Sequence, residues 1–287
     1  MERYQTIVVG GGVAGASSAY HLCNAGVRVL LLESGSHGEG DLHRTLQTQQ
    51  TRCPEDETQY LCRGAGSKVL SSPNVVKMIV QDYPVSSKEF IRHHGEHGAA
   101  TYLKLAQEGL SLQKSLARTV LSQPSRYLHE LGSIYLAYEE DLTAFQEEYQ
   151  LLRKCGASVQ WLDPQQLKQY PYLSKDFAAG ILFPEDAVID SSAYAKALVA
   201  AAQKTSCLTV WEHCADVVGA ETKEKGARVT LANGKVFTAE NALLCTGGFF
   251  LPAELCGILQ PCWSYLVAVP VDSSHPNGTY CISLCRV

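Results

Sequence analysis

The residues near the start of the chain whose types and spacing indicate a binding site are glycines. Residues 10–15 read Gly-Gly-Gly-Val-Ala-Gly, which matches the pattern G-x-G-x-x-G. In such a loop Gly10 allows a tight turn, Gly12 lets the backbone approach a pyrophosphate, and Gly15 lets the following helix lie close against the preceding strand. Backbone N–H groups and the positive end of the helix dipole then bind the phosphates without a basic side chain.

The segments around this loop predict the strand, helix and strand that such a site needs. Residues 6–9 and 27–32 are branched apolar runs typical of buried strands, and residues 13–24 have the composition of a helix with small residues on one side. Glu33 ends the second strand, 33 − 15 = 18 residues after the last glycine, where an acid is expected to bind ribose hydroxyls. The complete unit favours dinucleotide binding over the alternative of a glycine-rich turn without a ligand.

Composition limits the function classes. A chain of 287 residues with 46% hydrophobic content can bury a core large enough for two domains or lobes. The formal net charge of −5 and the lack of a lysine and arginine block argue against nucleic-acid binding. No apolar run is long enough to span a bilayer, and no leader precedes the first strand, so we expect a cytoplasmic protein. The 11 scattered cysteines, without C-x-x-C pairs, predict reduced thiols.

The middle of the chain predicts a separate lobe. Residues 34–72 are polar and irregular, and Ser86 to Glu89 fits a capping box that opens a helical segment over about 87–122, broken near Gly95. Residues 132–185 then alternate strands and helices, including a short helix from the Asp163 cap through Tyr170. This mixture predicts a lobe inserted into the first domain.

The chain is expected to return to the first domain near residue 191. A helix with many small residues starts there, and strands follow within 208–221 and 227–248. The pair Asn233-Gly234 between alternating apolar positions is a signal for a two-residue hairpin. Residues 261–271 predict one more strand.

Other clusters of chemically capable side chains have simpler explanations. His93 and His97 have the four-residue spacing of metal ligands on a helix, but Gly95 interrupts them and no H-E-x-x-H forms, so a solvated turn is favoured. Asp186 and Asp190 could be paired carboxylates, yet turn formation and capping of the helix after Ser191 explain them better. We therefore predict no metal site and identify no catalytic side chain.

Five pieces, in their order along the chain, resemble the FAD-dependent oxidoreductases of the D-amino acid oxidase, sarcosine oxidase and glycine oxidase type. They are VVGGGVAGASSAYHL, VRVLLLES, DSSAYAKALVAAAQ, ADVVGAE and LLCTGGF, and the resemblance covers most of residues 5–270. It implies an α/β fold, a Rossmann-like FAD-binding domain with an inserted mixed α+β substrate lobe. The implied FAD-binding domain comprises residues 1–85 and 186–260, the lobe 86–185 and 261–275, and an irregular tail 276–287.

The resemblance also assigns cofactor contacts. The glycine loop would hold the FAD pyrophosphate and Glu33 the ribose, Val217 would contact adenine through its backbone, and Thr246 would begin a second turn against the cofactor. A serine-containing loop and a lysine are weaker candidates, for which a solvated loop and an exposed lysine are the alternatives. The cofactor-binding residues implied are Gly10, Gly11, Gly12, Val13, Ala14, Gly15, Glu33, Ser34, Ser71, Ser72, Lys77, Val217, Thr246, Gly247 and Gly248.

The implied activity is oxidation of the carbon–nitrogen bond of an amino acid or secondary amine by hydride transfer to flavin, with oxygen or another acceptor taking the electrons. Family members continue past the strand at 261–271 with further sheet and a glycine-rich segment that covers the flavin, so we expect a truncated form. Two alternatives stay open. One is an NAD-dependent dehydrogenase, since the loop and Glu33 would also suit NAD, and the other is a non-catalytic truncated fragment that binds nucleotide.

Overall fold

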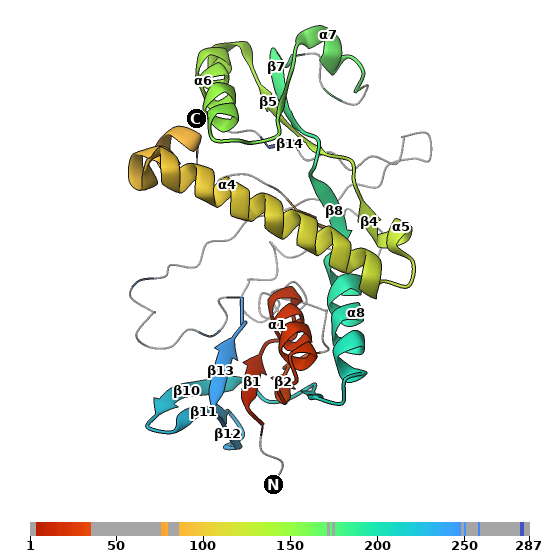
Figure 1. The fold of residues 1–287 in the computed structure, drawn as a ribbon, viewed down its shortest axis with the longest axis vertical. Helices are drawn as coiled ribbons and strands as arrows, with labels where there is room; N and C mark the ends of the chain where they lie inside the picture. Colours follow the sequence, from red (N-terminus) through yellow and green to blue (C-terminus); the bar gives the residue numbers. More distant parts are fainter. Residues whose placement is uncertain are drawn as a thin grey trace, which may run out of the picture. The chain divides into compact units, whose positions relative to one another are not determined.

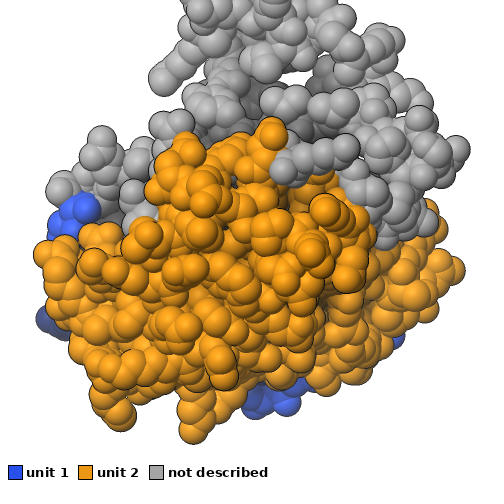
Figure 2. Space-filling view, turned by 90° about the horizontal axis from the view of Figure 1, so that it is seen from above, with its two compact units in different colours: residues 1–75, 190–268 blue, residues 76–189, 269–287 orange. Residues whose placement is uncertain are grey.

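The computed structural model describes most of the chain, in two compact units. The first unit comprises residues 1–75 and 190–268, and the second comprises residues 76–189 and 269–287 (Figure 2). In the sequence, the longer segment of the second unit is inserted between the two segments of the first. The residues described are 4–35, 76–79, 86–170, 173, 176–247, 250, 258 and 282–283.

The first unit contains a four-stranded parallel sheet, which agrees with the predicted α/β class. Its strands, in the order β13-β1-β2-β9, are Asn241–Leu244, Thr6–Val9, Val29–Leu32 and Leu208–Trp211. Figure 1 labels β13, β1 and β2 of this sheet. All residues of β1 and β2 are buried, as expected for the central strands of a parallel sheet. Strand β2 begins two residues later than predicted, because the Val27 N–H donates to the Leu22 carbonyl at the end of the preceding helix.

Two helices with small buried residues pack against each other in this unit. They are α1, Val13–Asn24, and α8, Ser191–Gln203, drawn red and teal in Figure 1. Ala16 and Ala19 of α1 are fully buried, which allows the helices to approach closely. Asp190 caps α8 by accepting a hydrogen bond from the Ala193 N–H at 2.8 Å. The capping role predicted for Asp190 is thus confirmed.

An antiparallel three-stranded sheet completes the described part of the first unit. Its strands are β10, Val217–Lys223, β11, Gly226–Leu231, and β12, Val236–Ala239. The predicted hairpin joins β11 to β12, but its loop has three residues, not two. The Leu231 N–H donates to the Lys235 carbonyl, the Gly234 N–H donates to the Leu231 carbonyl, and Gly234 has φ +82°. This is the three-residue hairpin in which a left-handed glycine follows the turn.

The second unit has two small sheets. One has the order β14-β5-β7-β6, with bounds Ile282–Ser283, Ser133–Ala137, Ala179–Phe183 and Gln160–Leu162. The other has the order β3-β8-β4, with bounds Val76–Ile79, Ala187–Asp190 and Leu128–His129. Strand β14 pairs in parallel with β5, so two residues of the segment expected to be irregular are in fact extended. The strand predicted at 261–271 lies outside the described residues.

The helices of the second unit follow the predicted pattern with one shortening. They are α4, Ser87–Val120, α5, Pro124–Tyr127, the 3-10 helix η1, Glu139–Asp141, α6, Leu142–Lys154, and α7, Pro164–Leu167. The predicted break in α4 occurs at Gly95, whose φ is +70°. Helix α7 ends before Tyr170 because residues 168–170 donate to carbonyls three positions back instead of four. None of the helices in the described ranges has the length and apolar character needed to cross a membrane.

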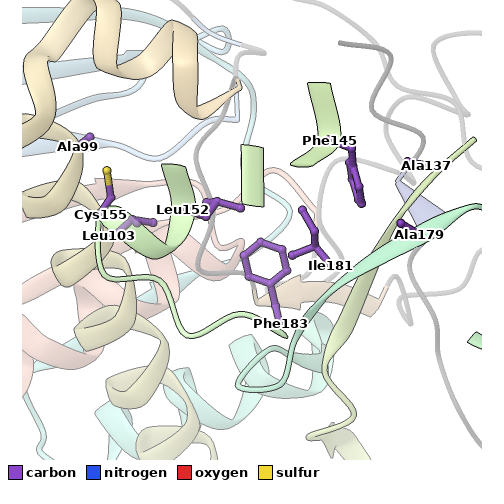
Figure 3. Packing of buried hydrophobic residues seen from close by; sticks show 9 residues of the cluster. All are labelled: Ala99, Leu103, Ala137, Phe145, Leu152, Cys155, Ala179, Ile181 and Phe183. Atoms are coloured by element: carbon purple, nitrogen blue, oxygen red, sulfur yellow. The ribbon is translucent and has the colours of Figure 1, made fainter. Parts of the chain in front are cut away.

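A hydrophobic core joins α4 and α6 to the larger sheet of the second unit. Phe183 and Ile181 on β7 are fully buried, as is Leu152 on α6. Figure 3 shows the cluster, which consists of Ala99, Leu103, Ala137, Phe145, Leu152, Cys155, Ala179, Ile181 and Phe183. The second unit therefore has a core of its own, as a separate lobe requires.

Candidate functional site

The carboxyl ends of three parallel strands meet at the glycine turn of the first unit. The Gly10 N–H donates to the Leu32 carbonyl at 2.8 Å, which joins the turn to the end of β2. The Cys245 N–H donates to the Val9 carbonyl at 2.7 Å, which brings the residue after β13 to the same place. Ligands of open α/β sheets bind at such carboxyl ends.

Gly10 and Gly15 are required by close backbone contacts. Gly10 has φ +101°, and a Cβ added there would lie 2.3 Å from the carbonyl oxygen of Cys245. A Cβ on Gly15 would lie 1.8 Å from the carbonyl oxygen of Gly10. The tight turn at Gly10 and the close approach of the helix at Gly15 are therefore confirmed as the reasons for these glycines.

Gly12 has open space in front of it, unlike Gly10 and Gly15. It is the N-cap of α1, with φ −67° and ψ −174°, and makes no side-chain capping bond. A Cβ added at Gly12 would meet nothing within 4 Å. Because the first amides of a helix, here from Val13 onward, lack acceptors within the helix and carry partial positive charge, this space suits a phosphate group.

Glu33 lies directly beside the glycine turn. Its Oε2 accepts a hydrogen bond from the Gly11 N–H at 2.5 Å, and its Oε1 accepts one from the Gly35 N–H at 2.8 Å. The hydroxyl of Ser34 lies 3.5 Å from the same Oε1. A carboxylate has about four acceptor positions, so Glu33 can still accept a hydrogen bond from a ligand hydroxyl. Sequence reasoning placed Glu33 at the end of β2 but did not foresee its bond to Gly11.

The second glycine turn follows β13, and the Cys245 N–H before it donates to the Val9 carbonyl before the first turn. The Thr246 hydroxyl donates to the Phe250 carbonyl at 2.9 Å, and Gly247 has φ +60°. Burial raises the pKa of the Cys245 thiol, an effect that a hydrogen bond with Ser18 opposes. Sequence reasoning missed Cys245, whose carbonyl oxygen leaves no space for a Cβ at residue 10.

Val217 starts β10 with its side chain toward the core. That side chain packs against a cluster consisting of Ile7, Val9, Leu30, Leu32, Val229 and Leu231. The register of β10 on β11 shifts between Val217 and Gly219, so the ladder is irregular at this position. The Val217 side chain is thus partly buried, and the backbone contact with adenine expected for it stays a prediction.

Four other predicted site residues lie in the second unit or outside the described residues. Lys77 lies in β3, which belongs to the second unit. Ser71, Ser72 and Gly248 lie outside the described residues. Within the described ranges, no three His, Cys, Asp or Glu side chains gather as metal ligands. The candidate site consists of the predicted residues in and beside the two turns at these strand ends: Gly10, Gly11, Gly12, Val13, Ala14, Gly15, Glu33, Ser34, Thr246 and Gly247.

Comparison with known proteins identifies relatives of most of the chain. A glycine oxidase of Bacillus licheniformis is 25% identical over 251 residues, which are 86% of this chain and 54% of that protein. The FAD-dependent oxidoreductase domain-containing protein 1 of Xenopus laevis is 26% identical over 179 residues, 62% of this chain and 29% of its own length. The chain thus spans about half, or less, of the length of the relatives it matches.

Solved structures agree on the fold. Glycine oxidase from Geobacillus kaustophilus superposes with a TM-score of 0.61 at 23% identity, covering 86% of this chain and 56% of that one. L-proline dehydrogenase from P. horikoshii gives a TM-score of 0.55 at 17% identity, with 85% and 53% covered. The family described as FAD dependent oxidoreductase matches residues 5–284. FAD, the cofactor predicted from the sequence, is the cofactor of that family, and the chain belongs to this family of FAD-dependent oxidoreductases.

Proposed function

We propose that this chain binds FAD at the glycine turn and that the whole protein oxidises the carbon–nitrogen bond of an amino acid or secondary amine. The observation that carries the proposal is the meeting of three strand ends at a turn with open space in front of Gly12. The similarity to a glycine oxidase supports the choice of substrate class. Oxygen or another acceptor takes the electrons in this proposal, and a cytoplasmic location stays a prediction.

Each part of the site has a separate task in this proposal. The chemistry that FAD supplies when bound is acceptance of a hydride from a carbon bonded to nitrogen. The amides at the start of α1 would bind the pyrophosphate in the space before Gly12, and Glu33 would accept hydrogen bonds from the ribose hydroxyls. The backbone of Val217 would contact the adenine, and Thr246 with Gly247 would form the second turn against the cofactor. Ser71, Ser72, Lys77 and Gly248 stay weaker candidates.

Membership in a family of FAD-dependent enzymes favours FAD over NAD. The alternative that the chain is a non-catalytic nucleotide-binding fragment needs a test of its own. Its support is that the chain spans only 54% of the length of the Bacillus licheniformis glycine oxidase. Binding and turnover must therefore be measured separately.

The experiment compares FAD and NAD on the purified chain. We expect a bound flavin spectrum after gel filtration, and a melting temperature that rises with FAD and not with NAD. A ligand at one hundred times its Kd stabilises a protein by about 2.7 kcal/mol, which is easily measured. Amino acids and secondary amines are then added without oxygen, and bleaching of the flavin absorbance reports oxidation. A colourless protein with an unshifted melt would contradict FAD binding, and bound flavin that no amine bleaches would favour the non-catalytic fragment.

A further inference from the structure

Strand β9 has a residue in the left-handed backbone conformation near each of its ends. Ser206, two residues before the strand, has φ +60°, and His213, two residues after it, has φ +52°. This conformation is unfavourable for a residue with a side chain, because the Cβ atom comes too close to the following carbonyl oxygen. Local strain of this kind gives reason to look for a function, and the two positions differ in what they contact.

The chain after β9 is hydrogen-bonded to the segment that follows β2. The Glu33 N–H donates to the Trp211 carbonyl at 2.8 Å, and the Cys214 N–H donates to the Glu33 carbonyl at 3.1 Å. The His213 N–H donates to the Gly35 carbonyl at 3.0 Å. Successive N–H groups of an extended strand point to opposite sides, so two neighbouring residues cannot both donate to one adjacent segment. The left-handed turn at His213 removes this restriction.

Gly35 connects His213 to the carboxylate of Glu33. The carbonyl of Gly35 accepts the His213 N–H, and the N–H of Gly35 donates to Glu33 Oε1 at 2.8 Å. The other carboxylate oxygen accepts the Gly11 N–H of the glycine turn. The carboxylate is therefore held between the glycine turn on one side and, on the other, a residue whose position depends on His213.

We propose that His213 is a positioning residue for cofactor binding: its left-handed backbone, acting through Gly35, fixes the Glu33 carboxylate in the orientation that binds the ribose of FAD. The role rests on the proposed function, because it requires that Glu33 binds ribose. It belongs to the backbone of His213, whose side chain is exposed. Glycine, which adopts a positive φ freely, can therefore replace His213, whereas the β-branched valine cannot.

Ser206 provides a matched position without this connection. Its N–H donates to the Gln203 carbonyl at 3.2 Å, within the turn that follows α8. This turn lies before β9, whereas Glu33 is bonded to the residues that end and follow this strand. Strain at Ser206 should therefore affect stability but not the Glu33 carboxylate.

The test measures FAD affinity of the full chain by titration of flavin fluorescence, together with the melting temperature without FAD. His213→Val should bind FAD about tenfold more weakly, since the ribose loses a well-oriented charged acceptor. His213→Gly should bind FAD within about twofold of wild type. Because both variants remove the imidazole, the difference between them reports the backbone conformation. His213→Ala, which is less strained than valine at this φ, should lie between them and is the variant to use if His213→Val does not fold.

Two controls separate positioning from general destabilisation. Ser206→Val should lower the melting temperature by about 2–6 °C, as His213→Val does, but should leave FAD affinity unchanged. Glu33→Ala combined with His213→Val should bind FAD no more weakly than Glu33→Ala alone, because His213 acts through this carboxylate. A purely structural effect of His213→Val would weaken binding equally in both backgrounds.

The outcomes distinguish this role from the proposed function. Wild-type FAD affinity in His213→Val, or the same loss of affinity with and without Glu33→Ala, would overturn the positioning role and leave the proposed function standing. Weaker FAD binding in Ser206→Val, equal to that in His213→Val, would also overturn the positioning role. A wild-type chain that does not bind FAD, or undiminished affinity in Glu33→Ala, would overturn the proposed ribose contact and the role of His213 with it.

Discussion

The Gly11 N–H donates a hydrogen bond of 2.5 Å to the Glu33 carboxylate. Gly11 lies in the turn after β1, and Glu33 directly follows β2. The other oxygen of the same carboxylate accepts the Gly35 N–H at 2.8 Å. Glu33 is therefore a structural residue of the turn as well as the expected ligand of the ribose. These two roles can be separated by measurement.

Glu33→Ala should lower both stability and cofactor affinity. Two partly buried N–H groups lose a charged acceptor, so we expect the free energy of unfolding in urea to fall by about 1–2 kcal/mol. FAD affinity should fall about ten- to a hundredfold, since the ribose hydroxyls of FAD also lose a charged acceptor. Glu224→Ala, at an exposed position of the same unit, is the control and should change neither quantity. Unchanged FAD affinity in Glu33→Ala would contradict the ribose role even if stability falls.

Gly12→Val should abolish FAD binding without unfolding the protein. Gly12 has a negative φ and an added Cβ meets nothing within 4 Å, so the fold accepts a side chain there. The valine would fill the space proposed for the phosphates. We expect the melting temperature without FAD to stay within about 2 °C of wild type, which corresponds to about 1 kcal/mol or less. FAD titration should show at least a hundredfold weaker binding.

Gly10→Ala gives the contrasting result. Its Cβ would lie 2.3 Å from the Cys245 carbonyl oxygen at a φ of +101°, so the turn itself must move. We expect a destabilisation of about 2–4 kcal/mol, measured in urea without any cofactor. If Gly12→Val were as unstable as Gly10→Ala, the space in front of Gly12 would not be free, and the proposed phosphate position would be wrong.

Local patterns were sufficient to predict the elements around the glycine turn. Strand β1 and helix α1 have the predicted bounds, and the kink of α4 is at the predicted Gly95. Apolar periodicity and glycine conformation are properties of neighbouring residues, so they can be read along the chain. The predicted length of the hairpin loop at Asn233-Gly234 was wrong. Two- and three-residue loops can both use this pair, and they differ only in backbone register.

Contacts between distant segments could not be predicted in the same way. The apolar run of β13 does not indicate which strand it pairs with. The pairing of β13 with β1, and with it the contact between the Cys245 carbonyl and Gly10, could therefore not be predicted. The bond from Gly11 to Glu33 depends on the order of strands in the sheet, which periodicity does not contain. The family resemblance supplied the order of the pieces but not these atomic contacts.

Glu148→Ala should weaken the second unit at the start of α4. The Glu148 carboxylate accepts hydrogen bonds of 2.9 and 3.0 Å from the Ser87 N–H and one of 2.6 Å from its hydroxyl, and Ser87 is fully buried. Removing the charged acceptor leaves these donors unsatisfied, at a cost of about 2–3 kcal/mol in the free energy of unfolding. Glu147→Ala is the matched neighbour, since its ion pair with Lys88 at 3.5 Å is exposed, and it should cost under about 1 kcal/mol. Equal effects of the two variants would refute the capping role of Glu148.

Glu130 should make the stability of the second unit sensitive to acid. Burial alone would raise its pKa, but hydrogen bonds and charges from Arg118 and Lys114 outweigh it and lower the pKa below the ordinary value of 4.5. A carboxyl whose pKa is lower in the folded state stabilises the fold above its unfolded pKa, and this contribution is lost as the pH falls through the folded pKa.

The variant Glu130→Gln tests this sign. At neutral pH we expect it to be less stable than wild type by under about 1 kcal/mol, because the Glu130 side chain is 40% exposed and its charges are screened. The difference in unfolding free energy between the two proteins should shrink below pH 4.5, as the carboxyl of the wild type becomes neutral. Glu140→Gln, an exposed position in η1, should show no difference at any pH. A difference for Glu130→Gln that stays constant down to strongly acidic pH would mean that the Glu130 charge does not stabilise the fold.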